Sequence, residues 1–208
     1  MDKTAFFIRT LREKGEVLDD IKKETGLDGI ILNSALTILF FSAIYGVAMG
    51  LFTGGFVILM DMVKVPLILL LVLYTSSPVY YVIAALAGLN VRFKQILALL
   101  SSSYAVAATV LLSFTPVVFV YSLSESSNSV IHFMHYALFS LAGVSGVYYL
   151  FTGMWSIYGR EERGKMNWLL PLMVGGLLTL LVGVKLVWLL KPYFHYNSYF
   201  FEGLGLML

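Results

Sequence analysis

Two histidines three residues apart are the side chains in this sequence best suited to bind a metal ion. His132 and His135, in the stretch HFMH, share one face of a helix, a spacing at which two imidazoles can ligate one ion. A metal site needs further ligands, and no carboxylate or third histidine lies nearby in the sequence. We therefore expect no metal and no cofactor, and interpret both histidines as hydrogen-bonding groups at the outer membrane interface. A metal or haem site is the less favoured alternative.

Hydroxyl side chains form a second group, in two apolar stretches that follow one another along the chain. They are Ser76, Ser77, Ser101, Ser102, Ser103 and Tyr104. Two antiparallel neighbouring helices would bring them together as a polar seam, and Pro78 predicts a kink beside its first two serines. Helix packing is the favoured interpretation of this seam, and a permeation path is the alternative.

A third group consists of charged residues at the ends of apolar runs. Lys64 comes just before Pro66, which we expect in the first turn of a helix, where its missing N–H has no cost. Lys64 then either extends its ammonium to the headgroups or pairs with Asp61 or a lipid phosphate and holds the preceding loop. Lys185 lies near the outer end of another apolar run and can reach the headgroups in the same way. We interpret these four residues as interfacial anchors.

The motifs of common enzyme classes do not occur in this sequence. It has no paired carboxylates, no glycine-rich phosphate loop and no nucleophile elbow. The absence of cysteine excludes disulfides and thiolate metal sites. The net charge of +2 gives no reason to expect a nucleic-acid partner. We expect a protein that is not an enzyme.

The composition is that of a membrane protein. Hydrophobic residues make up 59% of the 208 residues, charged residues 12%, and the mean hydropathy is +0.86. Since a spanning helix needs about 20 mostly apolar residues, the charges delimit five spans, at 29–50, 65–87, 95–121, 130–157 and 168–190. We therefore predict an all-α polytopic bundle of five transmembrane helices over 29–191, with the lipid bilayer as its main partner.

The basic residues predict an orientation for these spans. Eleven of the 14 Lys and Arg residues lie in the N-terminal segment, in the loop after the second span and in the loop after the fourth. Only Lys64, Lys185 and Lys191 lie on the other side. The positive-inside rule then predicts a cytoplasmic N-terminus and an outer C-terminus.

The two terminal segments are predicted to lie outside the spans. Residues 1–28 lack the pattern of a signal peptide and form an amphipathic helix candidate. Its apolar stripe comprises Phe7, Leu11, Leu18 and Ile21. We expect this stripe to pack on a protein partner or on the chain's own membrane domain. Residues 192–208 are rich in aromatics and resemble an interfacial belt.

Glycines are placed where helices could pack closely. Gly46, Gly50 and Gly54 recur at every fourth residue, and Gly143 and Gly146 give the fourth span a similar small-residue face. Residues 51–63 are too short for a further span and too apolar for an ordinary loop. We expect them to form a re-entrant or interfacial segment.

The stretch from 45 to 107 resembles the Yip family of Rab-GTPase-interacting, five-span membrane proteins, especially its prokaryotic branch. The matching motifs are YGVAMG at 45–50, KVPLILLL at 64–71 and FKQILALLSSSYAV at 93–106. The resemblance implies a membrane adaptor in a prokaryotic cytoplasmic membrane, without a catalytic centre. Where eukaryotic members carry Gly-Tyr and a later Leu-Pro in the third span, this chain has Ser-Ser-Ser-Tyr, and its N-terminal segment is short. GTPase binding is therefore not carried over.

Two functions are compatible with this sequence. The first is a non-enzymatic scaffold or adaptor that packs with other membrane proteins, as a subunit of a larger complex. The second is a small channel, transporter subunit or lipid-moving protein that uses the polar seam. Flux through reconstituted vesicles distinguishes them.

Overall fold

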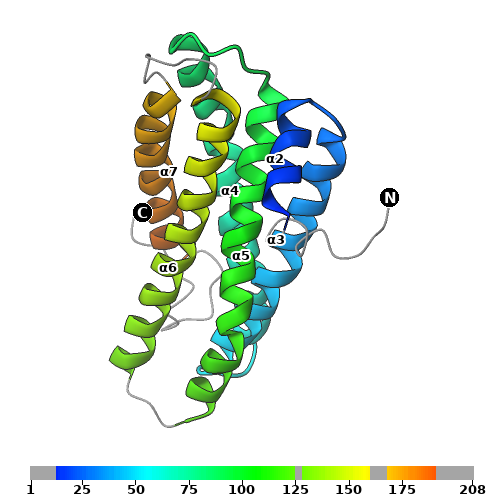
Figure 1. Cartoon of the computed structure of the whole chain (residues 1–208). Coiled ribbons are helices and arrows are strands. Elements are labelled where there is room, and N and C mark those ends of the chain that lie inside the picture. Colours follow the sequence, from blue (N-terminus) through cyan, green and yellow to red (C-terminus); the bar gives the residue numbers. More distant parts are fainter. Residues whose placement is uncertain (1–12, 125–127, 160–167, 191–208) are drawn as a thin grey trace.

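The computed structural model is all-α, with five long apolar helices and a short helix before them (Figure 1). It describes residues 13–124, 128–159 and 168–190. The helices are α2 (Lys14–Lys22), α3 (Leu27–Gly50), α4 (Val57–Leu86), α5 (Phe93–Leu123), α6 (Asn128–Met154), the π-helical turn η1 (Trp155–Gly159) and α7 (Leu169–Leu190). All five long helices have the length and composition to cross a membrane, with α6 and η1 forming one of them. The predicted fold class is confirmed.

The second span begins earlier than the sequence predicted. Residues 57–63 are the first two turns of α4, so only residues 51–56 connect α3 to α4. The expected separate segment at 51–63 is therefore wrong, and Pro66 lies inside the helix rather than in its first turn. The helix continues through this region because its first turns pack directly on α3, while the tight turn uses positive φ angles at Gly54 (+77°) and Gly55 (+60°).

The helices pack as a bundle in which α3 lies against both α4 and α5. Helix α6 packs on α5, and α7 packs on α4 while making little contact with α6. The main apolar core includes Ile38, Leu73, Ala98, Leu99 and Ala108. Helix α7 contributes least to the interior: 6% of its most apolar 18-residue window is buried, against 28–44% in the other four spans.

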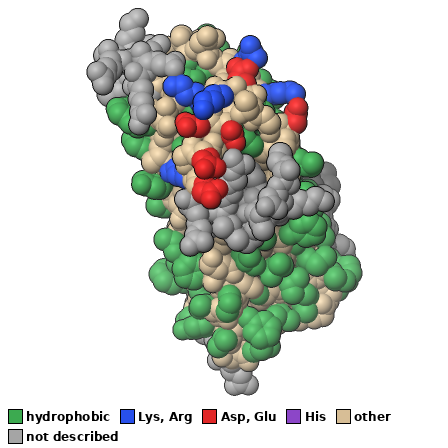
Figure 2. Space-filling model, turned by 45° about the vertical axis from the view of Figure 1, so that its right-hand side comes forward, with side chains coloured by type: hydrophobic (Ala, Val, Ile, Leu, Met, Phe, Trp, Pro, Cys, Tyr) green, Lys and Arg blue, Asp and Glu red, His purple; other side chains and the backbone are tan. Residues whose placement is uncertain are grey.

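The molecular surface separates into a charged end and an apolar body. Figure 2 shows Lys, Arg, Asp and Glu side chains gathered towards one end, and hydrophobic side chains over the region below them. The exposed apolar residues include Leu32 and Phe40 of α3, Val144 of α6 and Leu177 and Val184 of α7. Hydrocarbon is the solvent that such a surface requires, so the chain is an integral membrane protein.

Candidate functional site

Helix α2 lies at the charged end of the bundle and packs its apolar face on α5 and η1. Val17, Leu18 and Ile21 are buried. A Cβ on Gly153 of α6 would lie 3.1 Å from Leu18 Cδ2, so the glycine makes room for this helix. Leu18 and Ile21 are therefore occupied within the chain, which excludes them as a free partner-binding surface. The other two residues of the predicted stripe, Phe7 and Leu11, lie outside the described residues.

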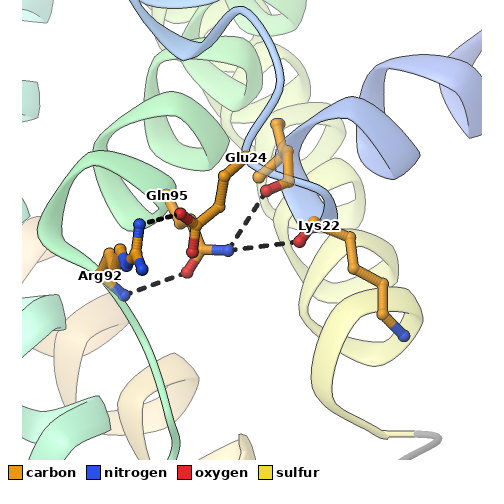
Figure 3. A network of polar contacts seen from close by, with 5 residues as sticks. Lys22, Glu24, Arg92 and Gln95 are labelled. Atoms are coloured by element: carbon orange, nitrogen blue, oxygen red, sulfur yellow. Dashed lines mark hydrogen bonds and ion pairs between the residues drawn. The ribbon is translucent and has the colours of Figure 1, made fainter.

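Polar contacts hold the end of α2 to the start of α5 (Figure 3). The Gln95 side-chain amide donates to the carbonyl oxygens of Ile21 (3.3 Å) and Lys22 (3.5 Å), and its Oε1 accepts from the Arg92 N–H at 3.0 Å. The Arg92 guanidinium also pairs with Glu24. Gln95 thus caps the C-terminus of α2, where the Ile21 carbonyl also accepts from the Glu24 N–H at 3.3 Å.

Lys14 holds the other end of α2 against α6. Its ammonium lies 4.8 Å from the centroid of the Tyr148 ring and 4.9 Å from that of Tyr149, and it donates to the Thr152 hydroxyl. Both rings attract a cation through their faces. The rings favour the charged form of the ammonium, whereas its partial burial disfavours that form and lowers the pKa of Lys14 below its ordinary value. The short helix is thus fastened to the bundle at both ends.

At the opposite end of the bundle, two glycines allow α3 and α4 to meet backbone to backbone. A Cβ on Gly46 would clash with the Asp61 carbonyl group and lie 3.1 Å from the Met62 Cα, and one on Gly50 would lie 2.7 Å from the Ile58 Cα. The backbones there leave no room for a methyl group.

The remaining predicted packing glycines differ from one another. A Cβ on Gly146 would lie 3.2 Å from the Ser103 carbonyl oxygen, so this glycine is at the contact between α6 and α5. Gly143 has nothing within 4 Å of its would-be Cβ, and Gly54 lies in the turn with open space around it. Within the described structure neither Gly143 nor Gly54 meets a neighbouring helix, because helical spacing does not say which side of a helix faces one.

Asp61 and Lys64 are both buried on α4. Their side chains are 2% and 0% exposed, and their spacing of three residues puts them on one face of the helix. Lys64 lies seven residues after Val57, about 10 Å along the helix. The prediction that Lys64 extends along the outside of the protein to the headgroups is wrong, because the first turns of α4 pack against α3 and enclose the lysine.

A buried Tyr–His hydrogen bond lies at a similar height. The Tyr45 hydroxyl of α3 and Nδ1 of His135 on α6 are 2.8 Å apart, and both side chains are buried. Tyr45 also packs edge-on against Phe139. His135 therefore faces the interior of the bundle rather than the interface predicted for it. Among the described residues no three His, Cys, Asp or Glu side chains gather into a group that could hold a metal ion.

Helical rise places these residues in one layer. Tyr45 lies five residues before the end of α3, and His135 lies seven residues after the start of α6, about 7 and 10 Å from the same end of the bundle. Lys64 lies at the corresponding height on α4. We call Tyr45, Asp61, Lys64 and His135 the buried polar layer. Asp61, Lys64 and His135 carry ionisable side chains, and ionisable groups buried in a membrane bundle are the pattern of a functional site.

The predicted polar seam is not one continuous feature. Ser101 and Ser102 donate to the Ala98 carbonyl of their own helix, and Ser77 donates to the Tyr74 carbonyl of α4. Ser103 donates across to the Gly146 carbonyl of α6 at 2.7 Å. All these serines are buried, but none of their hydrogen bonds within the described part of the chain joins α4 to α5. Ser77, Ser101 and Ser102 bond within their own helices, because a helix offers the carbonyl three or four residues back.

Lys185 is exposed on α7, with its ammonium 5.7 Å from the centroid of the Trp188 ring. An exposed lysine beside a tryptophan near a helix end has the composition of an interfacial anchor.

Sequence reasoning missed the buried polar layer. Tyr45 and His135 are 90 positions apart, so no local spacing relates them. One signal was available: both lie within about 10 Å of helix ends on the same side of the predicted membrane. Heights along the helices, and not motifs, could have brought them together.

No protein-family model, curated protein or solved structure matches this chain. The resemblance to the Yip family therefore stays a prediction. By its five apolar spans, the chain is a polytopic helical membrane protein.

Proposed function

We propose that this protein is a non-enzymatic membrane scaffold that binds the transmembrane helix of a partner protein through the outer face of α7. The observation that carries the proposal is the low burial of α7, 6% of its most apolar window, against at least 28% in every other span. Helix α7 is held on one side, by α4, and apart from Lys185 near its end its exposed face is apolar, including Met173, Leu177 and Leu181.

The internal use of the other packing features supports this choice of surface. Gly46, Gly50 and Gly146 are occupied by neighbouring helices of the same chain, and so is the apolar face of α2. Because those features are occupied within the chain, the proposal assigns partner binding to the outer face of α7. The proposal retains the Yip-like adaptor role, a prokaryotic cytoplasmic membrane and a cytoplasmic N-terminus, which the distribution of basic residues supports.

Cross-linking in native membranes tests the scaffold, because the chain has no cysteine of its own. Single cysteines at Leu177 and Leu181 of α7 are compared with controls at Leu36 and Phe40, which are exposed on α3. A hydrophobic cross-linker should give one discrete heterologous adduct from α7 and none from α3. A bulky change beside the reactive position, Val184→Trp, should abolish it.

Two outcomes would contradict this proposal. An adduct of twice the chain's mass would identify a second copy as the occupant. Equal, diffuse labelling at α7 and α3 would mean that lipid alone covers α7.

A second function, transport of a charged solute or a proton, is favoured by the buried polar layer. Asp61, Lys64 and His135 are buried within helices long enough to span the membrane. Intramembrane ionisable groups commonly mark ion or proton pathways. Such a pathway would differ from the serine-lined route expected from the sequence, because it would use the buried polar layer, which lies near the end of the bundle opposite α2.

Vesicle flux separates the second function from the first. Purified protein in liposomes should give a proton or ion flux that is lost in Lys64→Met and kept in Lys185→Met, whose lysine is exposed. No flux above that of empty liposomes would refute transport and leave the scaffold.

A further inference from the structure

Lys185 is an exposed cation on the face of α7 to which partner binding is assigned above. It follows Leu177 and Leu181 at intervals of four residues, so the three side chains share one side of the helix. The ammonium lies 5.7 Å from the centroid of the Trp188 ring, and within the described residues no carboxylate pairs with it. The proposed partner surface therefore includes a positive charge that no described acid neutralises.

The contact between α7 and α4 gives the depth of this lysine. Val72 of α4 packs at Gly183, where a Cβ would lie 3.9 Å from its Cγ2, and the two helices run antiparallel (Figure 1). Lys185, two residues further along α7, is therefore level with Leu70, two residues back on α4. Beyond that level α4 continues for 13 residues to its first residue, Val57, about 20 Å away.

Exposed apolar side chains cover α4 on both sides of this level. They extend from Leu59, which is 53% exposed, to Leu86, which is 81% exposed, a length of about 40 Å. Lys185 is level with a point about 16 Å from Leu59 and about 24 Å from Leu86. Since a hydrocarbon core is about 30 Å thick, the backbone of Lys185 lies inside the core wherever the core is centred on this surface.

This depth decides what can neutralise the lysine once a partner helix covers it. While lipid covers α7, the flexible stem can extend the ammonium towards the headgroups. A helix packed on Leu177 and Leu181 would replace that lipid and enclose the ammonium among apolar side chains. A charge enclosed there without a counter-charge is costly. Lipid phosphates lie outside the hydrocarbon core, so the counter-charge has to come from the partner helix.

We propose that the partner helix carries an aspartate or glutamate at the depth of Lys185, and that this ion pair determines which helix α7 binds. The inference rests on the proposed function, since it applies to a helix bound at this face. The ammonium has three donors, and both carboxylate oxygens can accept from them. Leucine side chains alone would not select a partner, because lipid tails are as apolar as leucine. The charge supplies that selectivity, since a helix without an acid leaves the lysine unpaired.

A synthetic helix tests the pair directly. The probe is a leucine–alanine transmembrane peptide that carries an acceptor dye and one aspartate five residues from one end, and the matched control has leucine at that position. The protein carries a donor dye on Leu177→Cys and is reconstituted in phosphatidylcholine liposomes. Energy transfer should show the aspartate peptide binding roughly 5- to 30-fold more tightly, the factor expected for one interhelical polar contact in a membrane. Lys185→Met should abolish this preference, and Lys185→Arg should retain it.

Cross-linking in native membranes separates this inference from the proposed function. In the Leu177→Cys background, Lys185→Met should lower the yield of the heterologous adduct, whereas Lys185→Arg should keep it. Replacing the acid of the captured partner with its amide should lower the yield to the same extent. Combining that change with Lys185→Met should cause no further loss, because both changes remove one pair.

Two results would overturn the ion pair. The first is equal binding of the two peptides, or a preference that survives Lys185→Met. The second is an adduct whose yield Lys185→Met does not change, which would leave the scaffold in place but show that the lysine reaches the headgroups past the partner. Absence of any adduct from Leu177→Cys alone would instead refute the scaffold, and the peptide assay would still decide the pair. A circular dichroism spectrum equal to that of the wild type verifies that each variant folds.

Discussion

Gly46→Ala tests the close approach of α3 and α4. The added methyl would clash with the Asp61 carbonyl group and lie 3.1 Å from the Met62 Cα. Backbone atoms cannot rotate away, so the two helices must separate, at a cost of about 1–3 kcal/mol for overpacking. Alanine recovers about 0.5–1 kcal/mol because it loses less backbone entropy than glycine in a helix.

The balance is a net loss centred on about 1.3 kcal/mol, with an upper limit of about 2.5 kcal/mol. In a chain of this length the central value lowers the melting temperature by about 3–5 °C. Thermal unfolding of the purified protein in detergent, followed by circular dichroism, measures this shift.

Gly143→Ala is the matched control, since nothing lies within 4 Å of the added methyl. It carries the same helical gain without the clash, so its melting temperature should be equal to or above that of the wild type. A Gly46→Ala protein as stable as Gly143→Ala would refute the argument, because it would show that α3 and α4 are not in backbone contact.

Three further predictions concern the ends and the interior of the bundle. Gln95→Ala should loosen the end of α2, because the Ile21 and Lys22 carbonyls both lose the side-chain amide that joins them to α5. Limited proteolysis should then cleave residues 13–26 faster, and equal cleavage would contradict the polar fastening. Lys64→Gln should lower the free energy of unfolding by about 3–5 kcal/mol, because it removes a buried charge beside buried Asp61. In the same thermal unfolding assay as for Gly46→Ala, the control Lys185→Gln should cost at most about 0.5 kcal/mol, because Lys185 is exposed. Similar losses in the two variants would mean that Lys64 is accessible to solvent. A single cysteine at Asn90 should react only from the cytoplasmic side and one at Glu125 only from outside, and labelling of both from one side would overturn the five-span topology.

Hydropathy and turn residues determined the spans from the sequence. Each span is a long local run of apolar residues, and a backbone that must satisfy its own hydrogen bonds in lipid has to be helical there. Four of the five predicted spans begin and end within a few residues of the observed helices. The exception is the start of α4, where residues 57–63 were separated from the span because Asp61 and Lys64 interrupt the apolar run.

That exception shows what only the tertiary structure decided. A charge at a span boundary looks the same in sequence whether it faces headgroups or the bundle interior, and the choice depends on what packs opposite. Here Gly46 has no side chain, which allows the backbones of α3 and α4 to come into contact next to Asp61. The same holds for glycine itself: Gly46 and Gly143 each have a second glycine within about one helical turn, but of these two only Gly46 meets a neighbouring helix in the described structure.

The pairings between distant residues also depended on the assembled bundle. Tyr45 meets His135 across 90 positions, and Ser103 donates to the Gly146 carbonyl across 43. Local periodicity states which residues share a helix face, but not which face meets which neighbour or at what height. In this protein the sequence determined the helices and the solvent they require, and the packing of one helix on another determined which polar side chains are buried together.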